Sequence, residues 1–200
     1  ALPMGVGGTI RWLETLGRAL DREDAARRLI RAELEPLLPT LERVRDRFLE
    51  GRRLAISAEP ALAAGLFAVA DELGLQVPLI LAQTRHEERL GCVREAIAAS
   101  RQRPLLLLDR GPLELETALR AFEEGRGAEL LIGASPDRDT AANLGLEFLE
   151  VGFPSFLQHA LFAKPLLGFA GMRRLADELV NAVQRLDYAR NRARASAESA

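Results

Sequence analysis

Two side chains that could carry chemistry lie close together in one segment of the chain. His159 is one of two histidines, and Lys164 is the only lysine among the 27 basic residues; they lie within six residues of each other. A neutral imidazole can ligate a metal or donate a proton near physiological pH, and an ammonium group pairs with an anion such as a carboxylate. Ser155 and Gln158 add a hydroxyl and an amide to the same segment. We therefore treat His159 as a candidate catalytic residue and metal ligand, and the other three as candidate cofactor-binding residues.

A simpler interpretation of the same residues stays open. His159 could only hydrogen-bond a backbone carbonyl, and Lys164 could be a solvated loop residue. The second histidine, His86, stands in a charged stretch and is predicted to lie on the surface.

The elements that must position these residues follow from the pattern of apolar residues. From residue 52 onward, five short apolar runs alternate with helical segments. The predicted strands are 53–57, 77–82, 104–109, 129–133 and 147–151, and the predicted helices are 60–73, 87–100, 112–124, 136–144 and 171–186. Such alternation predicts an α/β fold, a Rossmann-like open parallel sheet of about five strands with helices on both faces. Ligands bind at the carboxyl ends of such strands, so Ser135, which follows the fourth strand, joins the candidate cofactor-binding residues.

The ends of the chain lie outside this α/β pattern. Residues 1–50 are predicted to form an N-terminal helical segment, with Thr9 as an N-cap and with the helices bent or broken near Pro36 and Pro39. Residues 51–187 form the predicted Rossmann-like domain, and residues 188–200 are expected to be a flexible tail.

Composition excludes several classes of protein. The 200 residues are 48% hydrophobic and 28% charged with a net charge of −2, which argues against a strongly basic nucleic-acid binder. The one cysteine, Cys92, cannot build a disulfide framework or hold an iron–sulfur cluster, so we expect no cofactor on this chain alone. A lone cysteine also fits a reducing cytoplasm. No apolar run approaches a membrane span, and the start lacks the features of a signal peptide.

The usual nucleotide and hydrolase motifs are absent from the sequence. There is no G-x-x-x-x-G-K-[ST], no G-x-G-x-x-G after the first predicted strand and no G-x-S-x-G. The segment 152–171 is long for a loop and rich in Phe and Leu, so either the core of this domain or another domain must cover it. We predict that it is an interdomain or intersubunit surface.

Several segments resemble a known family in the same order along the chain. They are 3–9, 51–60, 65–66, 72–74, 127–135, 141–145, 151–154, 168–171 and 179–182. Together they are similar to the last domain of the nitrogenase component 1 superfamily. That superfamily includes the dinitrogenase subunits, their cofactor-assembly scaffolds, and the dark-operative protochlorophyllide and chlorophyllide reductases.

The resemblance implies a function for the whole protein. It implies a subunit of three Rossmann-like domains, of which this is the C-terminal one, paired with a homologous partner subunit. An ATP-dependent iron–sulfur reductase would deliver electrons to an iron–sulfur cluster or metal cofactor whose ligands come mostly from outside this chain. In catalytic dinitrogenase the loop after the last strand carries a histidine that ligates the metal cofactor, and His159, followed by the segment 168–171, is similar to that arrangement.

Two alternatives remain at this point. Other branches of the superfamily use the same loop for a tetrapyrrole substrate or for an interface. From the pattern of residues alone, the chain could also be a free-standing Rossmann-like module that binds a small ligand or a protein without catalysis.

Overall fold

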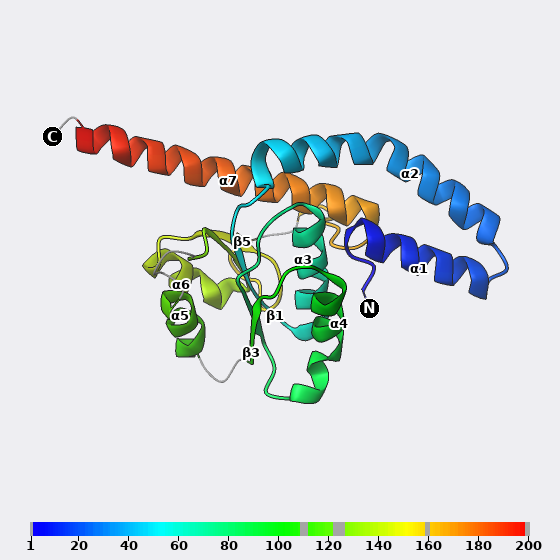
Figure 1. The fold of residues 1–200 in the computed structure, drawn as a ribbon, viewed down its shortest axis with the longest axis horizontal. Helices are drawn as coiled ribbons and strands as arrows, with labels where there is room; N and C mark the ends of the chain where they lie inside the picture. The colour runs from blue at the N-terminus through cyan, green and yellow to red at the C-terminus, as the bar shows by residue number, and fades with distance from the viewer. Residues whose placement is uncertain (1, 109–111, 122–126, 159–160, 199–200) are drawn as a thin grey trace.

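The predicted α/β architecture is confirmed. The computed structural model describes residues 2–108, 112–121, 127–158 and 161–198 of the chain. A parallel sheet lies in the middle, helices lie on both of its faces, and a pair of long helices extends to one side (Figure 1). His159 lies outside the described residues.

All five predicted strands are present. They are β1 (Leu54–Ala58), β2 (Leu79–Ala82), β3 (Leu105–Leu108), β4 (Leu130–Gly133) and β5 (Glu147–Glu150). Their order in the sheet is β3-β2-β1-β4-β5, and every neighbouring pair is parallel. The direction of chain growth across the sheet therefore reverses between β1 and β4, which makes this the topological switch point.

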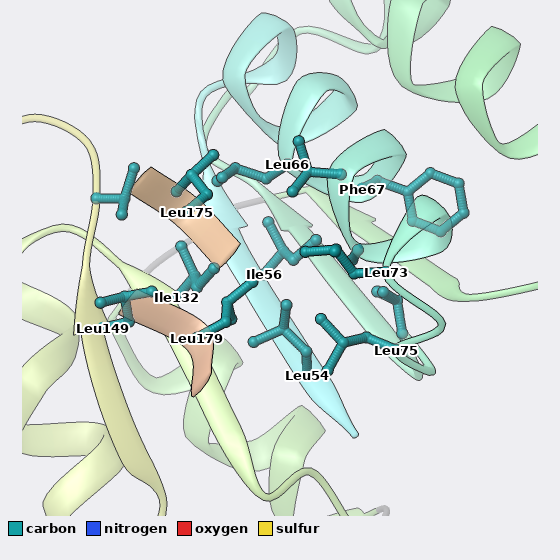
Figure 2. Packing of buried hydrophobic residues seen from close by; sticks show 14 of the residues in the cluster. Leu54, Ile56, Leu66, Phe67, Leu73, Leu75, Ile132, Leu149, Leu175 and Leu179 are labelled. Atoms are coloured by element: carbon teal, nitrogen blue, oxygen red, sulfur yellow. The ribbon is translucent and has the colours of Figure 1, made fainter. Parts of the chain in front are cut away.

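Two apolar clusters cover the two faces of the sheet. On one face, α3 (Pro60–Glu72) and α7 (Gly168–Glu198) pack on the sheet, and α4 (Gly91–Ala99) packs beside α3. On the other face, α5 (Pro112–Ala121) and α6 (Arg138–Asn143) pack on a smaller cluster. Leu54 and Ile56 of β1 point toward Leu175 and Leu179 of α7 in the larger cluster (Figure 2). Both faces of the central strand are thus buried, as expected for a parallel sheet.

Local sequence explains where the helices begin. The carboxylate of Glu59 accepts hydrogen bonds from the backbone N–H groups of Ala61 (3.2 Å) and Leu62 (2.7 Å), and Pro60 occupies the first turn of α3. The predicted helices 87–100 and 136–144 each begin with a short 3₁₀ turn, η2 (Glu87–Leu90) and η3 (Ser135–Asp137), before the α-helix continues.

The N-terminal helical segment forms a pair of helices. It consists of α1 (Gly5–Ala19), α2 (Glu23–Val44) and a π-helical turn η1 (Arg45–Leu49). α2 runs unbroken through Pro36 and Pro39 and follows a curved path in Figure 1. The two prolines therefore bend this helix without breaking it, as missing backbone donors do when packing holds the helix together.

The prediction that Thr9 caps α1 is wrong. Thr9 is buried inside α1, where its hydroxyl donates to the carbonyl of Gly5 at 2.6 Å. A side chain from another helix supplies the cap, because the carboxylate of Glu72 in α3 accepts from the N–H groups of Val6 (2.6 Å) and Gly7 (2.8 Å). Burial is the largest influence on this carboxyl and raises its pKa, although the two N–H groups and Arg11 oppose that shift.

The boundary predicted for the closing helix is also wrong. We expected this helix to span 171–186 and an irregular tail to follow it, whereas α7 runs from Gly168 to Glu198. The residues beyond 186 are rich in Ala and Arg, which favour helix. The guanidinium of Arg190 also pairs with Glu129 at 2.7 Å, which fixes this part of α7 to the sheet.

Among the helices of the described residues, none is both long and apolar enough to cross a membrane.

Substitution of Glu72 tests the cap on α1. Glu72→Ala leaves two helix N–H groups without an acceptor, so the free energy of unfolding should fall by about 1–2 kcal/mol, whereas Glu72→Gln keeps one acceptor and should lose less. Because burial raises the pKa of Glu72 in the fold, ionisation costs stability. The wild type should therefore lose stability relative to Glu72→Gln as the pH rises through that raised pKa.

Urea unfolding at several pH values measures these differences, with Glu35→Ala on the exposed side of α2 as the control. Equal losses in the Ala and Gln variants at every pH would contradict the capping role of Glu72.

Candidate functional site

A cavity opens at the carboxyl edge of the sheet, at the switch point between β1 and β4. Its volume is about 390 Å³. The lining residues come from the ends of β1, β2 and β4, from α5, η3 and α6, and from the segment after β5: Ser57, Leu81, Gln83, Arg85, Leu115, Ala134, Pro136, Asp137, Thr140 and Pro154. We call this the switch-point cavity. In open α/β sheets this is the place where ligands bind.

A hydrogen-bonded group of side chains joins three strand ends in this cavity. The amide of Gln83 donates to the hydroxyl of Ser57 (3.1 Å) and to the carboxylate of Asp137 (3.4 Å). Asp137 in turn accepts from the N–H of Ala134 at 3.0 Å. Gly133 permits this approach, because a Cβ atom there would overlap the Asp137 carboxylate.

The chemistry of this group is binding rather than bond breaking. Its members offer an amide, a hydroxyl and a carboxylate, and Arg85 adds a guanidinium to the wall. The oxygen of Ser57 accepts from the amide of Gln83, and among the described residues no hydrogen bond is found from its hydroxyl to a base that would activate it as a nucleophile. Such a set suits a polar ligand that is held by hydrogen bonds.

Glu150, at the end of β5, organises the loop that follows it. Its carboxylate accepts a short hydrogen bond from the buried hydroxyl of Ser135, and it is also hydrogen-bonded by Ser155 and by the N–H groups of Phe156 and Leu157. Burial raises the pKa of this carboxyl, but the hydrogen bonds together outweigh burial and hold the pKa below its ordinary value of 4.5. Glu150 is therefore an ionised anchor at neutral pH.

Ser135 completes the connection between strand end and loop. Its hydroxyl accepts from the N–H of Phe156 at 2.8 Å, and its own N–H donates to the carbonyl of Pro154 at 3.0 Å. The side chain of Ser135 is buried and engaged within the chain.

Beyond this anchor the loop presents apolar side chains to solvent. We use the name exposed loop for the described residues 152–158 and 161–167. Phe153, Leu161 and Phe162 are 88%, 85% and 86% exposed, and Phe156 is 65% exposed. Exposed apolar side chains gathered on one segment are typical of a surface that another protein or domain covers.

The structure brings together some of the candidate residues from the sequence. The ammonium group of Lys164 donates to the side-chain oxygen of Gln158 at 3.3 Å, and both residues are exposed on the exposed loop. Ser155 and Ser135 share Glu150 as a partner. The prediction that His86 lies on the surface is confirmed, because its side chain is 60% exposed.

Sequence reasoning did not single out Glu150 or Asp137. The available signal for Glu150 was a glutamate between Leu149 and Val151 at the end of a predicted strand, since a buried carboxylate needs hydrogen-bond donors. Asp137 gave no comparable signal, because its partner Gln83 is 54 positions away.

The side chains of the described residues do not fit an iron–sulfur cluster or a metal. No group of three or more His, Cys, Asp or Glu within that part of the chain could hold a metal ion. Cys92, at the start of α4, contacts the carbonyl of Arg89 and is the one cysteine available. A cluster requires several thiolates, so its ligands would have to come from elsewhere.

Most of the chain is similar to one known family of proteins. A profile of the family described as Nitrogenase component 1 type Oxidoreductase matches residues 1–184. The chain is 26% identical to the nitrogenase molybdenum-iron protein beta chain of Methanothermobacter marburgensis, over 94% of this chain and 40% of that protein. It is 33% identical to the nitrogenase iron-molybdenum cofactor biosynthesis protein NifN of Klebsiella pneumoniae, over 68% of this chain and 27% of that protein.

A solved structure shares the fold. Nitrogenase Cp1 at pH 6.5 superposes with a TM-score of 0.75 at 20% identity, over 92% of this chain and 39% of that chain. The chain therefore spans less than half the length of each of these relatives.

Substitution of Glu150 tests its role as the anchor of the exposed loop. Glu150→Ala removes the acceptor for Ser135 and for two backbone N–H groups, so the free energy of unfolding should fall by about 2–3 kcal/mol at pH 7. Because the pKa of Glu150 is lowered in the fold, its contribution is complete above the ordinary value of 4.5. It should disappear as the pH falls through the lowered pKa.

The matched control is Glu147→Ala on the same strand, which removes the ion pair between Glu147 and Arg185 of α7. This substitution should lower the free energy of unfolding by less than about 1 kcal/mol. Chemical unfolding at pH 7 and at pH 3 measures both variants. A loss for Glu150→Ala that is equal at the two pH values would show that the ionised carboxylate is not the anchor.

Proposed function

The chain belongs to the nitrogenase component 1 type oxidoreductase family, and from that premise we propose that it is the C-terminal domain of a subunit in a larger assembly. That assembly is a nitrogenase-like two-component reductase or the scaffold on which its metal cofactor is built. Similarity to both a nitrogenase beta chain and NifN supports this pair of roles.

The observation that carries the proposal is the exposed loop at the carboxyl edge of the sheet. Both ends of this loop are held by contacts within the chain. Glu150 holds its beginning, and Arg174 holds its end by donating to the carbonyl of Lys164 at 2.8 Å. The apolar side chains between these two contacts face solvent. A surface of this kind fits the preceding domains of the same subunit or a homologous partner subunit.

The same proposal assigns the redox chemistry to groups outside this chain. The iron–sulfur cluster or metal cofactor would be held mostly by residues beyond these 200, and an ATP-dependent iron–sulfur reductase would deliver electrons to it. This chain would contribute one wall of the cavity that holds the cofactor or substrate. His159, with Ser155, Gln158 and Lys164, would face that cavity, and the contact between Gln158 and Lys164 supports their grouping.

Substitution of His159 in the complete assembly tests this arrangement. If His159 faces the cofactor or substrate, His159→Ala should lower cofactor content or turnover by tenfold or more, which corresponds to about 1.4 kcal/mol. The thermal midpoint should remain unchanged. His86→Ala is the matched control, because it removes an imidazole that is exposed on another part of the surface.

We would measure the metal content and the turnover of the anaerobically purified protein. The metal content also distinguishes a catalytic subunit from a scaffold. Wild-type turnover and cofactor content in His159→Ala would show that the imidazole has no role at the site.

Assembly is tested separately through the exposed loop. The double variant Phe153→Ser, Phe162→Ser should fold as the wild type does, because both rings are more than four-fifths exposed. If the loop is an interface, the double variant should bind the partner subunit at least tenfold more weakly, because it lacks two aromatic rings that the partner would bury.

Leu20→Ser, at the end of α1 and 61% exposed, is the control for loss of an exposed apolar side chain. Sedimentation of the complete protein with its partner gives the affinity. Equal affinities of the wild type and the double variant would place the interface elsewhere.

A further inference from the structure

Arg53 has a buried guanidinium nitrogen without a partner. The residue lies directly before β1, and its backbone is fully used: its N–H donates to the Glu129 carboxylate at 3.1 Å, and its carbonyl accepts from the N–H groups of Glu129 and Leu130. The side-chain Nε is buried and has no hydrogen-bond partner. No ion pair of Arg53 is found in the described parts of the chain. An unpaired buried donor costs free energy, so this arrangement needs an explanation.

The guanidinium of the neighbouring Arg52, by contrast, is paired with carboxylates. Arg52 pairs with Glu129 and with Asp187 of α7. Because successive side chains of a strand point to opposite faces, Arg53 is directed to the opposite face of the sheet from α7. There it lines a cavity of about 890 Å³ at the amino ends of β1, β2 and β3.

We call this the amino-edge cavity, and its composition is cationic and apolar. Its lining residues are Arg53, Gln76, Val77, Pro78, Gln102, Arg103, Pro104 and Leu105. The guanidinium of Arg103 is positioned by the carbonyls of Ser100 (2.8 Å) and Gln102 (2.7 Å). Two arginines therefore line one cavity that also offers proline and aliphatic surface.

The nearby carboxylates are engaged elsewhere. Asp71 accepts from the side chains of Ser100 and Gln102, each at 2.8 Å. Glu129 is shared between Arg52, Arg190 and the backbone N–H of Arg53. Neither of them pairs with the side chains of Arg53 or Arg103, so the positive charge in the cavity is left without a counter-charge from the described residues.

We propose that the amino-edge cavity binds a small organic oxyanion, a phosphate or carboxylate group attached to an apolar body. Arg53, which lines the cavity, donates to the oxyanion from the terminal nitrogens of its guanidinium, in the planar geometry that suits such groups. Arg103 supplies a second cation, and the apolar body lies against Pro78, Pro104 and Leu105. This site is at the opposite edge of the sheet from the switch-point cavity, and it does not depend on the function proposed above.

The rigidity of the wall favours this assignment. The side chain of Gln102 accepts from the N–H of Val77 at 2.7 Å and donates to the carbonyl of Leu75 at 2.9 Å. These bonds tie the segment before β3 to the segment before β2. The wall of the cavity and the guanidinium of Arg103 are therefore fixed before a ligand binds, which reduces the cost of binding.

Calorimetric titration of the complete protein with phenyl phosphate and with benzoate tests the proposal. We expect saturable binding of at least one compound, which identifies the preferred oxyanion. Arg53→Met should weaken it at least tenfold, and Arg103→Met at least threefold. The control is Arg101→Met. Arg101 is exposed, lies two positions before Arg103 and does not line the cavity, so this variant should leave the affinity unchanged.

Thermal unfolding separates binding from folding. Without ligand, Arg53→Met should be at least as stable as the wild type, because it removes the unpaired donor. At the same ligand concentration the bound anion should raise the midpoint of the wild type more than that of Arg53→Met, while the rise for Arg53→Lys, which keeps the charge, should lie between them. Absence of saturable binding of either compound to the wild type, or equal affinities of the wild type and Arg53→Met, would overturn the proposal.

Discussion

The need to bury both faces of a parallel sheet determines where this chain can carry polar chemistry. β1 lies between β2 and β4, and all five of its residues are buried. Apolar clusters fill the space above and below the sheet. Polar groups are therefore concentrated at the two ends of the strands. Gln83, Asp137 and Glu150 lie at the carboxyl edge, and Arg52 and Arg53 lie at the amino edge.

Two carboxylates with similar partners respond to burial in opposite directions. Glu72 and Glu150 both accept backbone N–H groups, yet the pKa of Glu72 is raised and that of Glu150 is lowered. Two hydrogen bonds do not compensate Glu72 for lost hydration, whereas two hydroxyls and two N–H groups overcompensate Glu150. Protonation therefore favours the folded state at Glu72, where it relieves the cost of burying a charge, and disfavours it at Glu150, where it weakens the hydrogen bonds that hold the exposed loop.

The fold was more predictable from the sequence than the site, because the fold depends on local patterns. The apolar runs and their Gly and Pro boundaries were sufficient for all five strands. The errors involve partners that are distant in sequence: Glu72 caps α1 in place of Thr9, and Glu129 holds α7 through Arg190. The site depends on such partners throughout, as the contact between Ser135 and Glu150 illustrates.

In the proposed assembly, attachment of the exposed loop at both ends would lower the cost of binding a partner. Ser135 and Glu150 hold its first residues, and its end is held where the N–H of Gly168 donates to the carbonyl of Pro3 at 2.8 Å. Because the chain itself fixes both ends, a partner need order only the side chains between them. The entropy lost on association is then smaller, and more of the free energy from burying Phe153 and Phe162 remains available for binding.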